Sequence, residues 1–332
     1  MRLLKSTKKI CESKKVCLQI AKEVGLGTIA RMEDIQVSHL KWLDEIDGIG
    51  AVFPEDKYNV IKALQEAKII AGMTGDGVND SPALQVAEVG IAVKGSTDAA
   101  RAAASVVLTE SGLTGIVDLV ENGRSVYQRI LTWVINKVSR TTLKTGFVGL
   151  AYIFTGHLLI SALGMLVLTF MTDFVKITLA TDNVRASKSP DSWQIRPLTN
   201  VAVLIGMCMV VEALAMLLIG SRVVGISLSS HEIHTFSFLI LLFMALFSIL
   251  CIRERGPFWK SRPSKYLAIA LIADGIIGLA IGYFGIGDLP ALSASLIAIA
   301  FVGSALLSLG ANDLLKLKLY RLFHIYAEDA PA

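Results

Sequence analysis

Acidic and amide side chains gather in the segment 72–84, which reads GMTGDGVNDSPAL. The segment follows the apolar run KIIA and precedes a predicted helix. We therefore expect it at the carboxyl end of a strand, where parallel α/β sheets carry their functional loops. Asp76 and Asp80 would form an oxygen-rich site of the kind that Mg²⁺ prefers, and Asn79 could donate to a phosphoryl oxygen.

Glycines on both sides of Asp76 add to this interpretation, because Gly75 and Gly77 permit close approach of the backbone. The alternative is a turn whose Asp and Asn side chains only cap the following helix, as these residues do routinely. For Gly-Asp-Gly alone this alternative is favoured, whereas the full segment is far more specific.

The elements that must position this loop alternate between helices and strands. Helices are predicted over 16–27, 54–67, 80–87 and 96–104, and strands over 49–53, 68–74, 89–93 and 105–108. This rhythm implies a parallel sheet with covering helices, so an α/β domain is expected over residues 1–120. Helical periodicity then continues into the next apolar stretch, which predicts a helical stalk without a flexible linker.

Composition separates the two halves of the chain. Of 332 residues 53% are hydrophobic, and the mean hydropathy of +0.60 is typical of a protein with several membrane spans. Counting stretches of about 20 apolar residues predicts six transmembrane helices within residues 121–332. Their predicted bounds are 132–155, 158–180, 199–220, 235–253, 266–286 and 289–310, with a turn at 155–157 and a short amphipathic helix over 312–327.

Charge sets the expected location. Basic residues crowd alternate loops, which by the positive-inside rule places both termini in the cytoplasm. No secretory signal follows the basic start, so the first domain is expected to stay cytoplasmic. The net charge of +4 is small and predicts no nucleic-acid partner. The cysteines lack ligand spacing, which favours free thiols; they are Cys11, Cys17, Cys208 and Cys251.

Several segments together resemble one family. The run MTGDGVNDSPAL is similar to the hinge motif of P-type ATPases, the phosphorylated ion pumps built on a haloacid-dehalogenase-like phosphorylation domain. The resemblance extends upstream through GAVFPEDKYNVIKALQEAKIIAG and downstream through AEVGIAVKGSTDAARAAASVVLTESGLTGIVDLVENGR. It covers roughly residues 16–310, the C-terminal part of such a pump. The implied fold is a partial Rossmann-like phosphorylation domain followed by the helical bundle.

The resemblance also implies roles for individual residues. Lys57 of FPEDK would contact an aspartyl phosphate, and Asn79 would hold the phosphoryl group. Asp76 and Asp80 are assigned to Mg²⁺, with Asp80 also orienting the loop, as phosphoryl transfer depends on positioning and charge neutralisation. Loop residues expected to contribute to cofactor binding are Thr74, Gly75 and Gly77. In this family the cofactors are Mg²⁺ and ATP, the latter bound by a domain outside this sequence.

The segment TDFVKITLATDNVRASKSPDSWQIRPL resembles the proton-pumping branch known from plasma-membrane H⁺-ATPases. Asp173 matches the membrane aspartate of that branch, the presumed proton acceptor and donor, and an ionisable residue at membrane depth is a candidate functional site in itself. Lys176 and Lys144 are the candidate cations, and the family's arginine in the preceding span has no exact match. The alternative is a structural Asp–Lys pair. Weaker candidates, for which a structural role is favoured, are Glu212, Asp274 and His234.

Parts of a complete pump are missing from the 332 residues. The Asp-Lys-Thr-Gly-Thr segment with the phosphorylated aspartate, the nucleotide-binding domain and the Thr-Gly-Glu loop are absent, so the chain alone is not expected to hydrolyse ATP. The first hypothesis is the C-terminal portion of an ATP-driven cation pump, most plausibly for protons, in the plasma membrane, working with a chain that supplies the rest. The second is a non-enzymatic membrane relic or partner-binding module.

Overall fold

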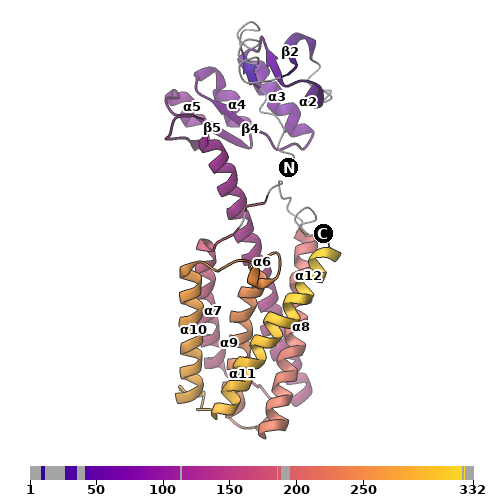
Figure 1. Cartoon of the computed structure of the whole chain (residues 1–332), viewed down its shortest axis with the longest axis vertical. Coiled ribbons are helices and arrows are strands. Elements are labelled where there is room, and N and C mark those ends of the chain that lie inside the picture. The colour runs from indigo at the N-terminus through magenta and orange to yellow at the C-terminus, as the bar shows by residue number, and fades with distance from the viewer. Residues whose placement is uncertain are drawn as a thin grey trace. The chain divides into compact units, whose positions relative to one another are not determined.

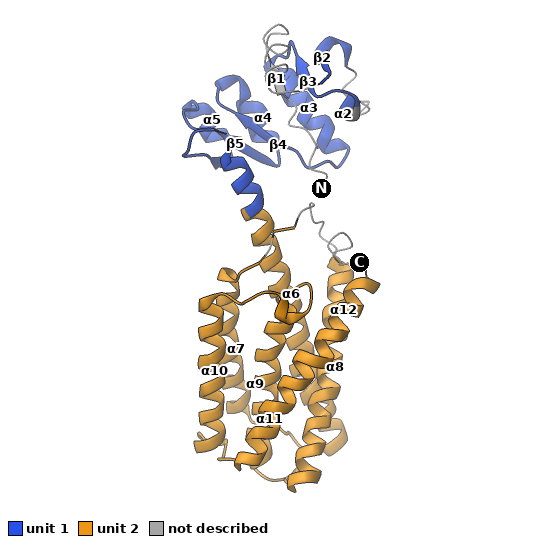
Figure 2. Cartoon of the chain, in the orientation of Figure 1, with its two compact units in different colours: residues 1–121 blue, residues 122–332 orange. Residues whose placement is uncertain are grey.

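The computed structural model of the chain forms two compact units, residues 1–121 and residues 122–332 (Figure 2). It describes residues 9–11, 27–35, 42–112, 114–184, 186–187, 195–323 and 325. Most of the helix predicted over 16–27 lies outside these residues, as does the Pro-Asp-Ser-Trp segment.

Unit 1 contains two separate three-stranded sheets, and every strand pair in them is parallel. The first has the order β1-β3-β2, with β1 Lys9–Cys11, β2 Ile29–Arg31 and β3 Gly48–Gly50. The second has the order β4-β5-β6, with β4 Gly72–Gly75, β5 Val89–Ala92 and β6 Val106–Val107. Parallel pairing agrees with the sequence, whereas a single sheet was expected. The haloacid-dehalogenase-like fold stays a prediction.

Short helices connect these strands: α2 Trp42–Glu45, α3 Pro54–Glu66, α4 Ser81–Val86 and α5 Asp98–Ala103. The start of α3 is set locally, because Pro54 needs no N–H partner in the first turn and the Phe53 N–H donates to Asp56 Oδ2 at 2.9 Å. The apolar faces of α3 and α4 bury Val60, Leu64 and Leu84 in one core. This core fixes α3 beside α4.

Unit 2 is helical (Figure 1). Its helices are α6 Thr114–Thr155, which begins in unit 1, α7 Ala162–Thr178, α8 Ile195–Ile219, α9 Glu232–Ile252, α10 Lys265–Phe284, α11 Ala294–Leu306 and α12 Asn312–Leu322. Two π-helical turns cover Gly220–Val224 and Leu307–Ala311. Turns of 3₁₀ helix cover Met32–Asp34, Val78–Asp80, Leu179–Thr181 and Phe258–Lys260.

The second π-helical turn joins α11 to α12 without a break, so the two form one helical stretch over 294–322. The separate amphipathic helix predicted over 312–327 is therefore the end of the last long helix. The turn predicted at 155–157 is present, with Gly156 at a φ of 71° that favours glycine.

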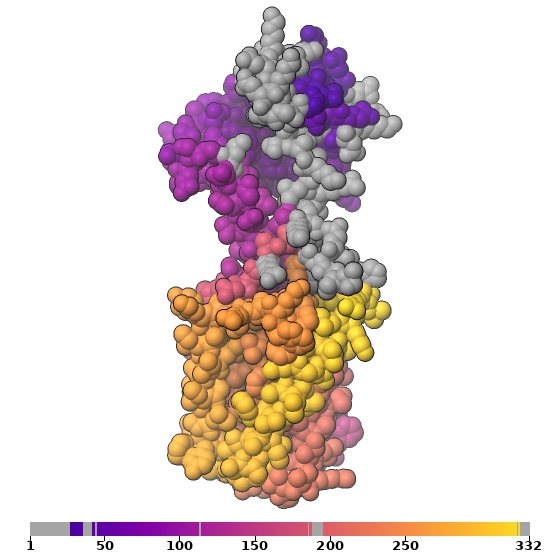
Figure 3. Space-filling model, viewed as in Figure 1, coloured from indigo at the N-terminus to yellow at the C-terminus, as the bar shows by residue number. Residues whose placement is uncertain are grey.

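Helix α9 is the centre of unit 2. It packs against α7, α8, α10 and α11, and its apolar residues face inward on all sides, as expected for a helix that is hydrophobic all round. By contrast, large apolar side chains of α7 and α10 face outward, where α10 forms part of the surface in Figure 3. Examples are Phe170, Phe174, Ile272 and Ile276. Such a surface suits lipid.

Among the described residues, five helices are long and apolar enough to cross a membrane. They are 162–181, 195–224, 232–252, 265–284 and 294–322. Helix α6 is not one of them, since Lys137, Arg140 and Lys144 lower the hydropathy of its second half. The sixth span, over 132–155, stays a prediction.

Candidate functional site

The loop after β4 is built around the carboxylate of Asp80. Lys57 Nζ, from the first turn of α3, lies 2.8 Å from Asp80 Oδ1, and both side chains are buried. The other oxygen, Oδ2, accepts the backbone N–H groups of Asp76 at 3.2 Å and Gly77 at 3.4 Å. Both carboxylate oxygens of Asp80 are therefore engaged in holding the loop.

The two glycines of the loop differ in their surroundings. A Cβ atom at Gly75 would lie 2.4 Å from Asp80 Cβ, a distance that no side chain tolerates. At Gly77 the nearest atom to a Cβ would be Asn79 N, at 3.9 Å, which leaves room. Close approach thus requires glycine at position 75, where the neighbour is the Asp80 side chain, and not at position 77.

Asp76 points outward. Its side chain is exposed and forms no hydrogen bond with the described residues, while its backbone carbonyl accepts the N–H of Thr97 at 2.8 Å. Thr74 and Asn79 are exposed beside it. The loop therefore presents one free carboxylate on a backbone whose N–H and carbonyl at Asp76 are both hydrogen-bonded.

This arrangement fits Mg²⁺ only in part. Asp76 offers one carboxylate, and the described residues contain no cluster of three or more His, Cys, Asp or Glu side chains. Mg²⁺ commonly binds through one or two carboxylates, with waters and phosphate oxygens completing the shell. Asp76 suits that mode, and the geometry of Asp80 favours its loop-orienting role over direct ligation.

Lys57 has hydrogen-bond donors that the described residues do not use. Its ammonium group uses one N–H on Asp80, and the described residues supply no partner for the remaining donors. At 7% exposed, the residue places an anchored positive charge beside the loop. A phosphoryl oxygen is a natural partner for such a group.

A second cluster of charges lies in unit 2. Asp173 forms an ion pair with Lys176 one turn later on α7, and the Asp173 side chain is 50% exposed. Lys144 of α6 reaches the same helix, where its Nζ donates to Thr169 Oγ1 at 3.1 Å. The structure thus brings together the residues predicted for ion transport.

The structure adds a cation that the sequence analysis missed. Arg140 of α6 is 2% exposed, and its Nη1 lies 3.5 Å from the backbone oxygen of Thr172, next to Asp173. It interacts electrostatically with Asp173 and with Asp274 of α10. Lys137, Arg140 and Lys144 recur at helical spacing, and this period is the signal that would have identified Arg140 as a further candidate.

Arg140 is also incompletely satisfied. Its Nε and Nη2 atoms have no hydrogen-bond partner among the described residues, and neither does Asp274 Oδ2. Buried polar groups are normally paired. These atoms therefore mark a place where a charged group could take a further hydrogen-bond partner.

A further ion pair of unit 2 is completely satisfied. Arg253 Nε and Nη2 contact the two carboxylate oxygens of Asp182 at 2.7 and 3.2 Å, and both side chains are buried. Arg253 also donates to the carbonyls of Asn183, Ser261 and Arg262, and Asp182 Oδ1 accepts the Ser264 N–H. This network ties the end of α7 to the segment between α9 and α10.

Comparison with known proteins matches the helical part to a family. The family described as the C-terminus of cation transporting ATPases matches residues 157–317. A protein of Methanocaldococcus jannaschii, described as a cation-transporting ATPase, is 37% identical over 249 residues, which cover 75% of this chain and 31% of that protein.

Two eukaryotic relatives give the same result. A plasma membrane ATPase of Kluyveromyces lactis is 32% identical over 268 residues, 80% of this chain and 29% of its own length. One from Dictyostelium discoideum is 30% identical over 297 residues, 83% of this chain and 27% of its own. The chain spans about a third of the length of these relatives.

Proposed function

Because this chain belongs to the P-type cation-transporting ATPases, to whose C-terminal part it corresponds, we propose that it contributes part of the phosphoryl-transfer site and the membrane ion site of an ATP-driven proton pump. The nucleophile, the nucleotide site and the actuator would come from sequence beyond these 332 residues.

The observation that carries the proposal is the buried contact between Lys57 Nζ and Asp80 Oδ1. It joins two motifs that lie 23 positions apart and places a cation and the free carboxylate of Asp76 at one loop. A generic helix-capping turn has no need of a buried lysine whose other donors stay unused.

At this loop each residue has a separate task. Lys57 neutralises a phosphoryl oxygen, Asn79 donates to another, and Asp80 holds the backbone of Asp76 and Gly77 in place. Asp76 would bind Mg²⁺, which supplies charge neutralisation at the phosphoryl group when bound. Thr74 and the backbone of Gly75 and Gly77 would border the same phosphoryl and Mg²⁺ site.

In the membrane, Asp173 would accept and release the transported cation. Lys176, Lys144 and Arg140 surround it with positive charge, which disfavours a metal cation and leaves a proton as the best candidate, since a proton neutralises the carboxylate without further ligands. When Asp173 is neutral, the Arg140 guanidinium would instead pair with the carboxylate of Asp274.

The setting is a lipid bilayer, with both termini on the cytoplasmic side of the plasma membrane. Basic residues between α9 and α10, including Arg253, Arg255 and Arg262, support this orientation. The loop between α8 and α9 carries fewer.

Complementation tests the proposal. We would co-express the chain with the N-terminal part of the Methanocaldococcus jannaschii relative, reconstitute the pair in liposomes, and add ATP and Mg²⁺. An acid-labile phosphoprotein and ATP-driven proton uptake are expected. Lys57→Met and Asp76→Asn should abolish phosphorylation, whereas Asp173→Asn should spare phosphorylation and stop proton uptake.

Glu232→Gln, an exposed change at the start of α9, is the matched control and should retain both activities. Phosphorylation that is unchanged by Asp76→Asn would refute the Mg²⁺ assignment. Proton uptake that survives Asp173→Asn would refute the ion site.

A further inference from the structure

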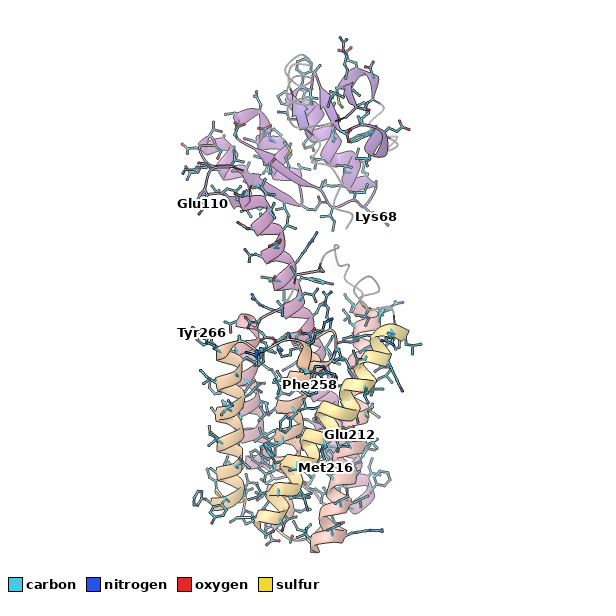
Figure 4. The ribbon with its side chains drawn as sticks, viewed as in Figure 1. Lys68, Glu110, Glu212, Met216, Phe258 and Tyr266 are labelled. Carbon is cyan, nitrogen blue, oxygen red and sulfur yellow. The ribbon has the colours of Figure 1, made fainter. Side chains whose placement is uncertain are left out.

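Helices α8 and α12 meet along a polar stripe that the proposed pump site does not use. Cys208, Glu212 and Met216 lie at successive turns of α8. Opposite them, Ser304, Ser308 and Asn312 follow at successive turns of the last long helix. Contacts join Met216 to Ser304 and Glu212 to Asn312, so the two stripes run antiparallel. Figure 4 labels Glu212 and Met216 within the helical unit.

Glu212 is the centre of the stripe. Its Oε2 accepts a hydrogen bond from Asn312 Nδ2 at 2.7 Å, and its Oε1 lies 3.7 Å from Cys208 Sγ. Glu212 is 8% exposed and Asn312 is 1% exposed. The π-helical turn just before Asn312 adds a local irregularity of the kind that often marks functional positions in helices.

No cation compensates a negative charge here. Among the described residues Glu212 forms no salt bridge, and Cys208, Asn312 and Ser308 are neutral. Asp313 and Lys316, which follow Asn312 on α12, pair with each other at 2.6 Å. Lys316 Nζ also donates to the carbonyls of Cys251, Glu254 and Gly256, so its donors are used.

Among the described residues, the other helices packed on α8 bring no counter-charge either. From α9, Cys251 interacts electrostatically with Glu212 and donates to Asp313. From α6, Ser139 donates to the Ala202 carbonyl, and the basic residues of that helix interact with Asp173, Lys176 and Asp274. Arg222, in the π-helical turn after α8, is exposed. A carboxylate buried in these surroundings would be strongly unfavourable.

A proton on Glu212 resolves both this charge and a second irregularity. Asn312 Oδ1 is buried and has no partner among the described residues, and a protonated Glu212 carboxyl could supply the donor that it lacks. The Asn312 amide would then donate to one carboxyl oxygen while the other carboxyl oxygen donates back. If the amide were rotated, its oxygen would face Glu212 Oε2, and a proton on Glu212 would be needed there as well.

We propose that Glu212, Asn312 and Cys208 form a second proton-binding site in the membrane unit, separate from Asp173, that holds its proton at neutral pH and links α8 to α12. The ligand is the proton alone, because the described side chains do not provide the several anionic or carbonyl oxygens that a metal cation requires. The inference does not depend on ATP-driven transport.

Carbodiimide labelling tests it on the full chain in nanodiscs. Dicyclohexylcarbodiimide adds to protonated carboxyl groups in apolar surroundings and leaves carboxylates unmodified. Mass spectrometry of peptides should find the adduct on Glu212 at pH 7, with less adduct as the pH is raised. Asp182, paired with Arg253, is the internal control and should stay unlabelled.

Infrared spectroscopy gives a reading that does not depend on reagent access. The spectrum of Glu212→Gln at pH 7 should lack the carbonyl stretch of a protonated carboxylic acid that the unmodified chain shows. The glutamine keeps one donor and one acceptor for Asn312 but does not titrate. Its thermal midpoint should therefore match that of the unmodified chain at about pH 4, where glutamate is largely protonated in the folded and the unfolded chain alike. As the pH is raised, the midpoint of the unmodified chain should fall below that of Glu212→Gln, because only the unfolded chain releases the Glu212 proton. Loss of a carboxylate band instead of the acid band would overturn the proposal, whatever the result for Asp173.

Discussion

The Arg253–Asp182 and Asp173–Lys176 ion pairs belong to the same helical unit but differ in how completely they are satisfied. Asp182 and Arg253 are buried, contact each other through two hydrogen bonds, and use their remaining atoms on backbone groups. Asp173 is half exposed and faces more positive groups than its single charge can balance. Nearby, Arg140 keeps two nitrogens without a described partner.

This difference separates a charge network that is fully paired from a cluster in which charges and donors are left over. A network in which every donor and acceptor is used has no free group that could bind a ligand. Its role is to hold the helices in place. A cluster with unbalanced charge and spare donors can change partners when a proton or cation arrives. The Lys57–Asp80 pair is intermediate. Both carboxylate oxygens of Asp80 have hydrogen-bond partners, whereas Lys57 uses only one of its N–H donors on a described residue.

The largest effect is expected at the saturated network. Asp182→Asn leaves the Arg253 guanidinium buried without a counter-charge, which should cost about 3–5 kcal/mol of unfolding free energy. Denaturant titration of the purified chain in detergent, followed by circular dichroism, would measure the loss. Asp288→Asn, in the exposed loop before α11, is the control and should change little. A small loss at Asp182 would break the distinction drawn between the two pairs.

A smaller effect is expected at the loop of unit 1. Gly75→Ala places a Cβ 2.4 Å from Asp80 Cβ and should destabilise the loop by about 1–3 kcal/mol. Gly77→Ala, at a position with room, should cost about 0.5–1 kcal/mol or less. Hydrogen exchange at the Asp76 and Gly77 amides measures both variants, and equal exchange rates in the two would show that Asp80 does not hold the loop as described.

The smallest stability effect is expected at Asp173. Because its pair with Lys176 is half exposed, Asp173→Asn should change the unfolding free energy by about 1 kcal/mol or less, even though it should stop proton uptake in the complemented pump. The same detergent titration applies, with Phe174→Leu, an exposed neighbour, as the reference. A loss as large as that of Asp182→Asn would make Asp173 a structural residue.

Much of this architecture was predictable from local sequence. The helical spans after residue 157 follow from apolar stretches, and the parallel strands from the alternation with short helices. The placement of Asp76 and Asp80 after a strand follows from Gly and Asp after an apolar run. In each case the deciding signal is the pattern of residue types within a short stretch of sequence.

Other features depended on residues distant in sequence. Arg140 was overlooked because a basic residue in an apolar helix does not by itself show which neighbour it faces; only the packing of α6 on α7 and α10 does. The number of sheets in unit 1 was also mispredicted, since strand pairing is a long-range choice. Close packing requires glycine at position 75 but not at position 77, and this difference could be seen only once the position of the Asp80 side chain was known.

By itself the sequence determined the family and the division into an α/β part and a helical part, because these rest on composition, period and short motifs. Tertiary structure decided which charges are saturated and which are spare. Whether Asp80 contacts Lys57, or Glu212 lies against Asn312 and away from any cation, depends on how helices pack, and burial sets the energy of a charge only once those neighbours are in place.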